Sequence, residues 1–249
     1  MKSKLASIAA FGLLACEGPP PDFEVIAEYR HDPSAYTQGL VTSGSLLFES
    51  TGLYGRSDVR RVDLATGATL ARRQLDSSRF AEGLALHEGR LYQLTYRENV
   101  AYVYDTTTLA PTDSFSFAGE GWGLASDGKR LFLSDGSDSI RVIDPQSFAT
   151  ERVLHVRYQD SPLSQLNELE FFEGRLLANI YESNWIAMIN PVDGLVERML
   201  DFADLYANRA PNSRVMNGIA VTPDGKHLLL TGKFWPTLFE VRILPRANP

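Results

Sequence analysis

Hydrophobic and polar positions alternate in short runs along most of this chain, which is the pattern of β-strands with one buried face. The runs recur in units that open with a polar or aromatic residue, then Gly or Glu, then Leu or Ile. The copies of this opening motif are Gln38-Gly39-Leu40, Glu82-Gly83-Leu84, Trp122-Gly123-Leu124, Asn167-Glu168-Leu169 and Asn217-Gly218-Ile219. The apolar anchors that end the motif are 44, 40, 45 and 50 residues apart.

Each unit contains enough alternating segments for four strands. Tight-turn pairs such as Asp127-Gly128 and Asp224-Gly225 separate the first two strands, because these residues accept a positive φ. The predicted third strands are Val59 to Asp63, Val100 to Asp105, Ile140 to Asp144, Trp185 to Asn190 and Leu238 to Arg242. An outer strand such as Thr150 to Val156 follows. Five such units predict an all-β fold, a five-bladed β-propeller with four-stranded blades, and the alternative is a sandwich with accidental spacing.

The two ends of the repeat region complement each other. The last unit ends at Leu244 without an outer strand, whereas a spare strand, Phe23 to Tyr29, precedes the first anchor. We expect this N-terminal strand to complete the fifth blade, because closure removes exposed sheet edges. The predicted propeller domain therefore spans residues 23–245.

The first residues have the features of a secretory signal. Two lysines precede an apolar stretch, Leu5 to Ala15, which is too short to span a bilayer. The stretch ends in Leu13-Leu14-Ala15-Cys16, which resembles a bacterial lipoprotein box, and Cys16 is the single cysteine. We expect a signal peptide at 1–15, lipidation of Cys16, a tether at 16–22 and a periplasmic protein that contacts the membrane only through its lipid. An ordinary signal with an incidental cysteine is the alternative.

The composition argues against a nucleic-acid partner and against several classes of catalytic site. The 249 residues carry a net charge of −7, with a pI near 5.2, so a nucleic-acid partner is not expected. We expect a monomer. The four histidines are isolated in sequence, which argues against a His-based zinc site, and no nucleophile elbow, P-loop or dinucleotide motif occurs.

The opening motifs also predict the functional site. Equivalent positions of a closed propeller form a ring about its axis, so the first residues of the five motifs should converge: Gln38, Glu82, Trp122, Asn167 and Asn217. Glu82 is the one carboxylate among them, and an apolar surround would raise its pKa and suit it to proton transfer. Lys233 ends an apolar strand just before two aromatic residues. This setting favours a lysine in the functional site over a solvent-exposed lysine at a strand edge. The alternatives are that Glu82 caps backbone amides or pairs with an Arg, that the amides bind strand ends, and that Trp122 fills the channel.

Several segments resemble the plant-type glutamine cyclotransferases, a family with bacterial members. They are Tyr36-Thr37-Gln38-Gly39-Leu40, Phe48 to Ser57, Phe80-Ala81-Glu82-Gly83-Leu84, Gly121-Trp122-Gly123-Leu124, Leu166-Asn167-Glu168-Leu169-Glu170 and Gly232-Lys233-Phe234-Trp235-Pro236. The similarity runs from about Phe23 to Arg242, and the stretch from Glu49 to Gly55 is its most specific part.

The resemblance implies a five-bladed propeller that converts the N-terminal glutamine of peptides and proteins to pyroglutamate and releases ammonia. The catalytic Glu of the family falls on Glu82, and its Gln, Asn and Lys fall on Gln38, Asn167 and Lys233. We assign Glu82, Lys233 and Asn167 to catalysis. The remaining residues assigned to substrate binding are Gln38, Tyr36, Phe80, Tyr96, Trp122, Tyr181 and Asn217. The plant enzymes carry Trp at the positions of Tyr96 and Tyr181, so pocket size and substrate preference stay open.

One carboxyl group is sufficient for the expected reaction. It takes a proton from the attacking amine and returns it to the leaving amide nitrogen, so catalysis requires no metal or other cofactor. The sequence leaves room for a structural cation in the central channel. Two other functions remain as alternatives: a metal-dependent lactonase or sugar-acid hydrolase, with Glu82, Asn167 and Asn217 as calcium ligands, and a non-catalytic envelope scaffold.

Overall fold

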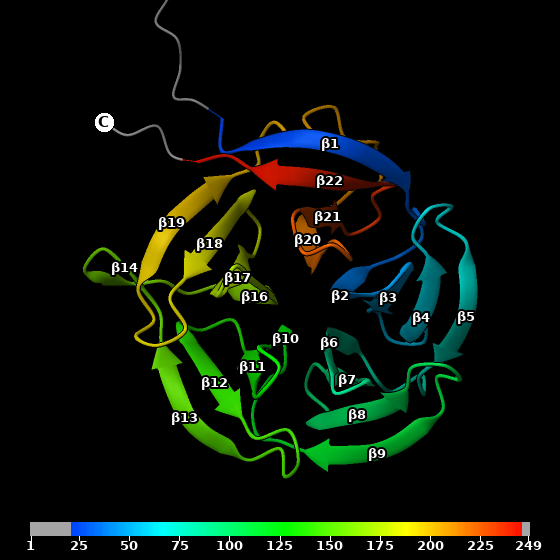
Figure 1. Cartoon of the computed structure of the whole chain (residues 1–249). Coiled ribbons are helices and arrows are strands. Elements are labelled where there is room, and N and C mark those ends of the chain that lie inside the picture. Colours follow the sequence, from blue (N-terminus) through cyan, green and yellow to red (C-terminus); the bar gives the residue numbers. More distant parts are fainter. Residues whose placement is uncertain (1–20, 246–249) are drawn as a thin grey trace, which may run out of the picture.

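A computed structural model describes residues 21–245, which form five four-stranded antiparallel sheets arranged around a central axis (Figure 1). This confirms the predicted five-bladed propeller. The signal peptide and the lipidation site predicted at residues 1–16 lie outside the described residues.

In each blade the strands run from the axis to the rim. The first blade contains β2 (Thr37–Ser43), β3 (Leu46–Thr51), β4 (Asp58–Asp63) and β5 (Thr69–Gln74). The second contains β6 (Ala81–His87), β7 (Arg90–Thr95), β8 (Val100–Asp105) and β9 (Pro111–Ser116). The third contains β10 (Leu124–Ser126), β11 (Leu131–Ser134), β12 (Ser139–Ile143) and β13 (Thr150–His155). The fourth contains β16 (Leu166–Phe172), β17 (Arg175–Ile180), β18 (Trp185–Ile189) and β19 (Val196–Asp201).

The fifth blade joins the two ends of the fold. It contains β20 (Met216–Val221), β21 (Leu228–Gly232), β22 (Thr237–Ile243) and, as its outer strand, β1 (Phe23–Arg30). The antiparallel ladder between β1 and β22 runs from Phe23 opposite Ile243 to Arg30 opposite Thr237. The predicted strand closure is therefore confirmed.

Asp22, the last residue of the predicted tether, is bound to the fourth blade. Its carboxylate accepts hydrogen bonds from the Arg198 guanidinium at 2.5 Å and from the Asp201 backbone amide at 2.8 Å. The structured region thus begins at least one residue before the predicted boundary, because this carboxylate anchors the chain before β1.

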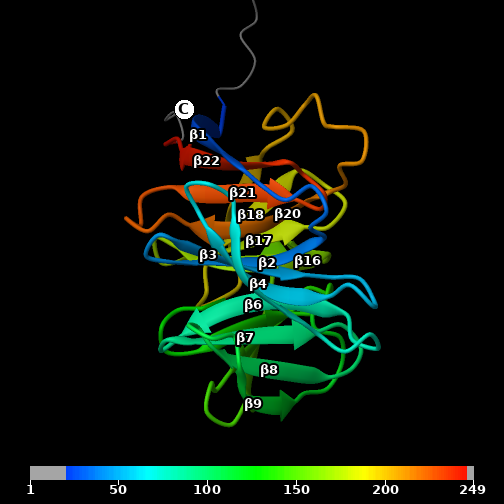
Figure 2. The same cartoon turned by 90° about the vertical axis from the view of Figure 1, so that its right-hand side faces the viewer.

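Two segments were not predicted as structural features. The short strands β14 (Arg157–Tyr158) and β15 (Ser161–Pro162) form a small hairpin between the third and fourth blades. The segment 202–215, between β19 and β20, extends from one edge of the disc (Figure 2). Residues 21–245 include no helix long and apolar enough to cross a membrane.

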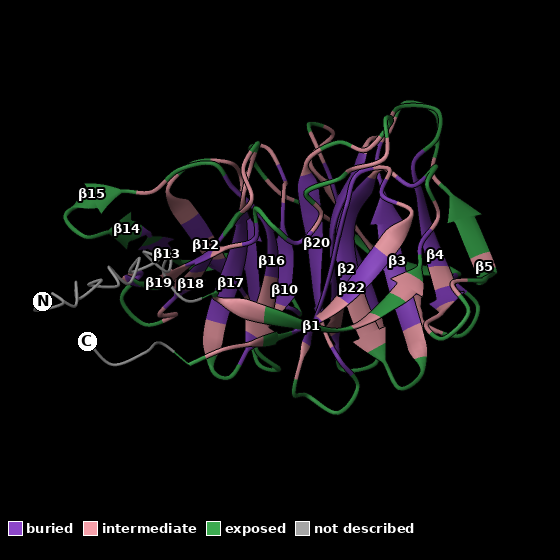
Figure 3. Cartoon of the chain, turned by 90° about the horizontal axis from the view of Figure 1, so that it is seen from above, coloured by how far each residue is buried: buried purple, intermediate pink, exposed green. Residues whose placement is uncertain are grey.

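The core lies between neighbouring blades. The five anchor side chains of the repeat are all buried: Leu40, Leu84, Leu124, Leu169 and Ile219. The inner strands are almost wholly buried, whereas the outer strand β5 is largely exposed (Figure 3). Packing of apolar inner faces between blades therefore holds the opening motifs in place around the axis.

Candidate active site

A β-bulge occurs at the opening motif in four of the five blades. The pairing register shifts between Thr37 and Gly39, Ala81 and Leu84, Leu166 and Leu169, and Met216 and Ile219. A bulge leaves a residue out of the ladder and re-aims its side chain. The polar residue that precedes each anchor is thus released from the regular strand alternation.

The glycine of the motif lets adjacent inner strands approach each other. A Cβ on Gly39 would lie 2.4 Å from the Leu84 nitrogen, and one on Gly123 would lie 2.0 Å from the Asn167 oxygen. In the fourth blade Glu168 replaces this glycine. Its buried carboxylate accepts hydrogen bonds from the backbone amides of Leu40 at 3.2 Å and Ile219 at 2.8 Å. These bonds link the fourth blade to the first and fifth blades.

Glu82 lies in the bulge of β6 and is only 6% exposed. Its backbone carbonyl accepts the Ser50 hydroxyl at 2.5 Å, which fixes the main chain. Within residues 21–245 its carboxylate accepts no hydrogen bond and forms no ion pair within 4.0 Å. Backbone capping, the alternative role considered for Glu82, is therefore carried out by Glu168. The carboxylate oxygens of Glu82 remain free to bind a substrate.

Burial raises the pKa of Glu82 well above its usual range, and the charge of Lys233 opposes this shift. Lys233 is 3% exposed and follows β21 directly. Burial lowers its pKa to about 8, with Glu82 acting in the opposite direction. The two groups are thus electrostatically coupled, and each has a pKa displaced toward neutrality.

Aromatic rings form a continuous wall around this pair. The Lys233 ammonium lies 4.7 Å from the centroid of Tyr36 and 5.3 Å from that of Tyr181. Tyr181 packs edge-on against Trp122 at 5.5 Å. On the other side Tyr36 contacts Phe80 at 6.2 Å, and Phe80 contacts Tyr96 at 5.9 Å. The structure thus brings together all five aromatic residues that the sequence assigned to the site.

The three predicted amide residues fall into two groups. Gln38 and Asn167 are each 3% exposed, and the Asn167 side chain has no hydrogen-bond partner within the part of the chain that the structure describes. Asn217 is fully buried, and its Nδ2 donates to the Thr37 carbonyl at 3.0 Å and to Gln38 Oε1 at 3.2 Å. Asn217, which the sequence assigned to substrate binding, is therefore placed behind Gln38 and orients it.

Charged residues that sequence reasoning missed support the wall from outside. Glu120 accepts the Trp122 indole N–H at 3.0 Å and the Arg97 guanidinium at 2.8 Å. Arg97 in turn stacks 4.5 Å from the Tyr96 centroid. Glu98 accepts the Tyr54 hydroxyl at 2.9 Å and the Phe80 amide at 3.3 Å. These residues lie in loops outside the repeat motif, so no periodicity marked them.

The described residues contain no group of three or more His, Cys, Asp or Glu side chains placed to hold a metal ion.

Comparison with known proteins relates this geometry to one family. The sequence profile of the family described as glutamine cyclotransferase matches residues 7–243. Glutaminyl-peptide cyclotransferase of Arabidopsis thaliana is 40% identical over 228 residues, which cover 89% of this chain and 71% of the plant protein.

Solved structures agree with this match. Glutaminyl cyclase of Myxococcus xanthus superposes with a TM-score of 0.82 at 33% identity, covering 91% of this chain and all (100%) of the other. Hydrazine synthase of Kuenenia stuttgartiensis shares only the fold, with a TM-score of 0.51 and 19% identity over 82% of this chain and 56% of that one. The chain therefore belongs to the glutamine cyclotransferase family.

Proposed function

We propose that this protein is a glutaminyl-peptide cyclotransferase, which converts the N-terminal glutamine of peptides or proteins to pyroglutamate, and that Glu82 is its general acid/base. The observation that carries the proposal is a nearly buried carboxyl group, unbound by other described residues, beside a buried lysine within an aromatic wall. Family membership favours this function over the lactonase and scaffold alternatives.

Glu82 has two proton transfers to perform. The neutral α-amine of the substrate attacks its own γ-carboxamide carbon, so a C–N bond forms and the attacking nitrogen becomes positively charged. The Glu82 carboxylate takes a proton from that nitrogen and then delivers it to the amide nitrogen. The bond from carbon to this second nitrogen breaks, and ammonia leaves. The raised pKa of Glu82 suits the first step, because it makes the carboxylate a stronger base toward the amine proton than an ordinary glutamate.

Lys233 and Asn167 act on the oxygen of the reacting amide. Negative charge develops on that oxygen in the tetrahedral intermediate, where a buried ammonium and an amide N–H stabilise it more than in water. The Nζ of Lys233 makes no hydrogen bond with another described residue, so its N–H donors are free to bind a substrate. Gln38, held by Asn217, supplies a fixed amide for substrate recognition.

The aromatic wall supplies orientation. Closing a five-membered ring requires the amine and the carboxamide to be held in a folded conformation, which lowers the entropic part of the barrier. Tyr181 and Trp122 on one side and Tyr36 and Phe80 on the other confine an aliphatic glutamine side chain. The tyrosines at 96 and 181 present smaller rings than tryptophan, and we propose that they admit bulkier residues after the glutamine.

In the proposed reaction Glu82 carries out both proton transfers, and Lys233 and Asn167 stabilise the oxyanion, so we propose that catalysis needs no metal. Dialysis against a strong chelator should leave turnover unchanged while circular dichroism confirms the fold. Loss of activity that calcium or zinc restores would contradict this part of the proposal. A structural cation in the channel is compatible with full activity in chelator.

The direct test of the function is incubation with a Gln-initiated dipeptide. We expect each substrate molecule to yield one ammonia and one pyroglutamyl dipeptide. An ammonia assay measures the first product, and mass spectrometry shows the second as a loss of about 17 Da, the mass of NH₃. The matched control is the N-acetylated dipeptide, whose nitrogen cannot attack. Ammonia release from the acetylated control would indicate a deamidase instead.

We also propose that Cys16 anchors the propeller to a bacterial membrane by lipidation, on the basis of the sequence motif. Attached acyl chains contribute on the order of 0.8 kcal/mol per buried methylene. Cys16→Ser should abolish fatty-acid labelling and membrane association and leave kinetics unchanged. Unlabelled wild-type protein free in the periplasm would show an ordinary cleaved signal.

A further inference from the structure

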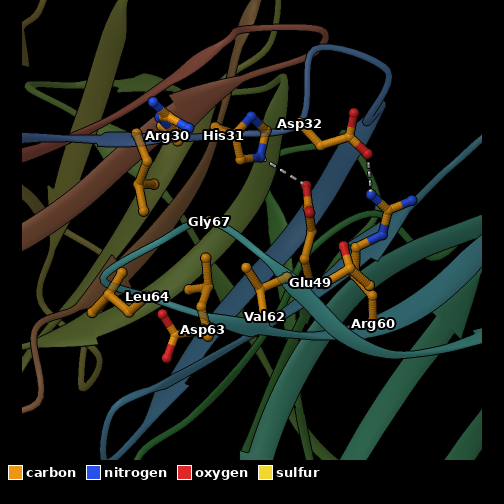
Figure 4. Close-up of a pocket in the computed structure, with 12 residues that line it drawn as sticks. Arg30, His31, Asp32, Glu49, Arg60, Val62, Asp63, Leu64 and Gly67 are labelled. Carbon is orange, nitrogen blue, oxygen red and sulfur yellow. Dashed lines mark hydrogen bonds and ion pairs between the residues drawn. The ribbon is translucent and has the colours of Figure 1, made fainter.

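A buried ion pair that the proposed reaction does not use joins the first and last blades. His31 lies in the connection between β1 and β2 and is 8% exposed, and Glu49 lies on β3 and is 1% exposed. Their atoms Nε2 and Oε1 are 3.1 Å apart (Figure 4). They line a small cavity whose walls contain none of the catalytic or substrate-binding residues proposed above.

Both nitrogens of the His31 ring face hydrogen-bond acceptors. Nε2 faces the Glu49 carboxylate, and Nδ1 lies 2.6 Å from the Trp235 carbonyl oxygen. The Thr231 hydroxyl, 3.5 Å from Nδ1, donates to the Thr237 carbonyl and so offers His31 a lone pair. Beside an ionised Glu49, a neutral imidazole with its one N–H can satisfy only one of these contacts, whereas the imidazolium satisfies both. The contacts of the ring therefore fit an imidazolium paired with a carboxylate.

The contact of His31 with the Trp235 carbonyl, here called the first arm, connects the ion pair to Lys233. Trp235 closes the turn that follows Lys233, and its amide donates to the Gly232 carbonyl at 3.0 Å. Phe234, between Lys233 and Trp235, adopts a φ of 63°, which is rare for a non-glycine residue. The surrounding structure must hold such a conformation, and the bond from His31 to the Trp235 carbonyl is one of the contacts that do so.

The contact of His31 with the Glu49 carboxylate, the second arm, connects the ion pair to Gln38. The Glu49 carboxylate that faces His31 also accepts the Thr37 hydroxyl at 2.7 Å. Thr37 immediately precedes Gln38 in the bulge of β2 and is fully buried. A single imidazolium therefore contacts the carboxylate that fixes the Gln38 strand and the carbonyl that fixes the Lys233 turn.

The surrounding charges favour the ionised pair. Burial opposes a charged His31, but the Glu49 carboxylate and the Trp235 carbonyl outweigh burial, so the pKa of His31 is raised. Burial likewise opposes ionisation of Glu49, but the His31 charge and the more distant Arg60 charge hold the pKa of Glu49 below its usual range. The other charged groups that face the cluster are Asp32 and Asp58, which bind Arg60 at 2.7 Å, and Arg30 and Asp63, which line the cavity.

We propose that His31 is a positioning residue which, as an imidazolium, holds Lys233 and Gln38 in register across the closure between the last and first blades. The inference rests on the proposed function, because it takes Lys233 and Gln38 as site residues. It assigns the buried pair a role in catalysis that needs no contact with the substrate.

Two substitutions separate the two arms. In H31N the amide nitrogen replaces Nδ1 and can retain the Trp235 bond while Glu49 loses its partner. In H31Q the longer side chain can retain the Glu49 bond while the Trp235 carbonyl loses its donor. We expect H31N to raise KM through Gln38 and H31Q to lower kcat through Lys233, each by roughly tenfold, since small misplacements of catalytic groups are costly.

The matched control is H227N. His227 also faces a glutamate, Glu240, at 2.6 Å, but this pair lies outside the proposed site, so kcat and KM should not change. Folded H31N and H31Q proteins with wild-type kcat and KM would overturn the proposal.

A second measurement does not depend on the variants folding. In ¹⁵N NMR of the wild-type protein at pH 7, we expect both ring nitrogens of His31 to be protonated. A singly protonated ring would overturn the proposal even if ammonia release from a Gln dipeptide supports the proposed function. Absence of ammonia release would instead count against the function itself.

Discussion

The ammonium group of Lys233 lies 4.7 Å from the centre of the Tyr36 ring and faces an aromatic surface instead of a carboxylate partner. A cation over an aromatic face is stabilised by the ring quadrupole but keeps its N–H donors. Together with burial, which lowers the pKa of Lys233 to about 8, this leaves a group that is charged at neutral pH and close to losing that charge. The site therefore combines a lysine of lowered pKa with a glutamate of raised pKa.

The value of kcat/KM should depend on pH through three ionisations, those of Glu82, the substrate amine and Lys233. The reaction needs Glu82 and the substrate amine deprotonated, and the Glu82 pKa is raised, so log kcat/KM should approach a slope of two on the acid side. It should fall again above a pH of about 8, as Lys233 loses its proton. A profile measured with a Gln dipeptide that has a single acid ionisation and no alkaline decline would contradict these assignments.

Replacing Lys233 by methionine should have two effects. Loss of oxyanion stabilisation should lower kcat by about 10²- to 10³-fold. The Lys233 charge lowers the pKa of Glu82, so its removal should move the acid limb to higher pH. Lys233→Arg is the control, because a guanidinium keeps its charge and should remove the alkaline decline. A methionine variant with an unshifted acid limb would show that the two groups are not coupled.

Tyr181 should contribute through its ring and not through its hydroxyl. Tyr181→Ala removes an aromatic face from Lys233 and an edge contact from Trp122, so KM should rise by roughly 2- to 30-fold, the range that a cation–π contact of about 0.5–2 kcal/mol gives. Tyr181→Phe keeps the ring and should stay within about twofold of wild type in steady-state kinetics. Equal losses in both variants would assign the role to the hydroxyl.

Removal of the closing strand should destabilise the whole propeller. Deleting residues 1–30 removes β1 and exposes the edge of β22, so aggregation is expected. Deleting residues 1–20 keeps Asp22 and its bonds to the fourth blade, and it should leave the melting temperature unchanged. Size-exclusion chromatography and thermal unfolding measure both outcomes, and a soluble, cooperatively unfolding product of the longer deletion would contradict the closure.

The repeat carried most of the fold information. The spacing of the five anchors and the turn pairs predicted the blades and the closing strand, because each strand depends on local alternation and each anchor on burial. The ring prediction also placed Glu82 correctly in the inner strand of its blade. It did not reveal that Glu168, at the glycine position of its motif, accepts hydrogen bonds from the backbone amides of two other blades.

What the sequence did not predict depends on long-range contacts. The roles of Asn217 behind Gln38 and of Glu120 behind Trp122 come from hydrogen bonds that alternation does not encode. The pairing of His31 with Glu49 joins the connection between β1 and β2 to β3 of the first blade. His31 stands alone among its sequence neighbours, so no local pattern indicates this contact.

If Glu82 transfers both protons, the turnover of Glu82→Gln on a Gln-initiated dipeptide should show it. Glutamine preserves the shape of the side chain but cannot accept and return a proton, so kcat should fall by at least about 10²-fold while circular dichroism shows an intact fold. A folded Glu82→Gln protein that retains more than about a tenth of wild-type turnover would show that Glu82 is not the general acid/base, because acid–base catalysis by this residue should contribute more than that.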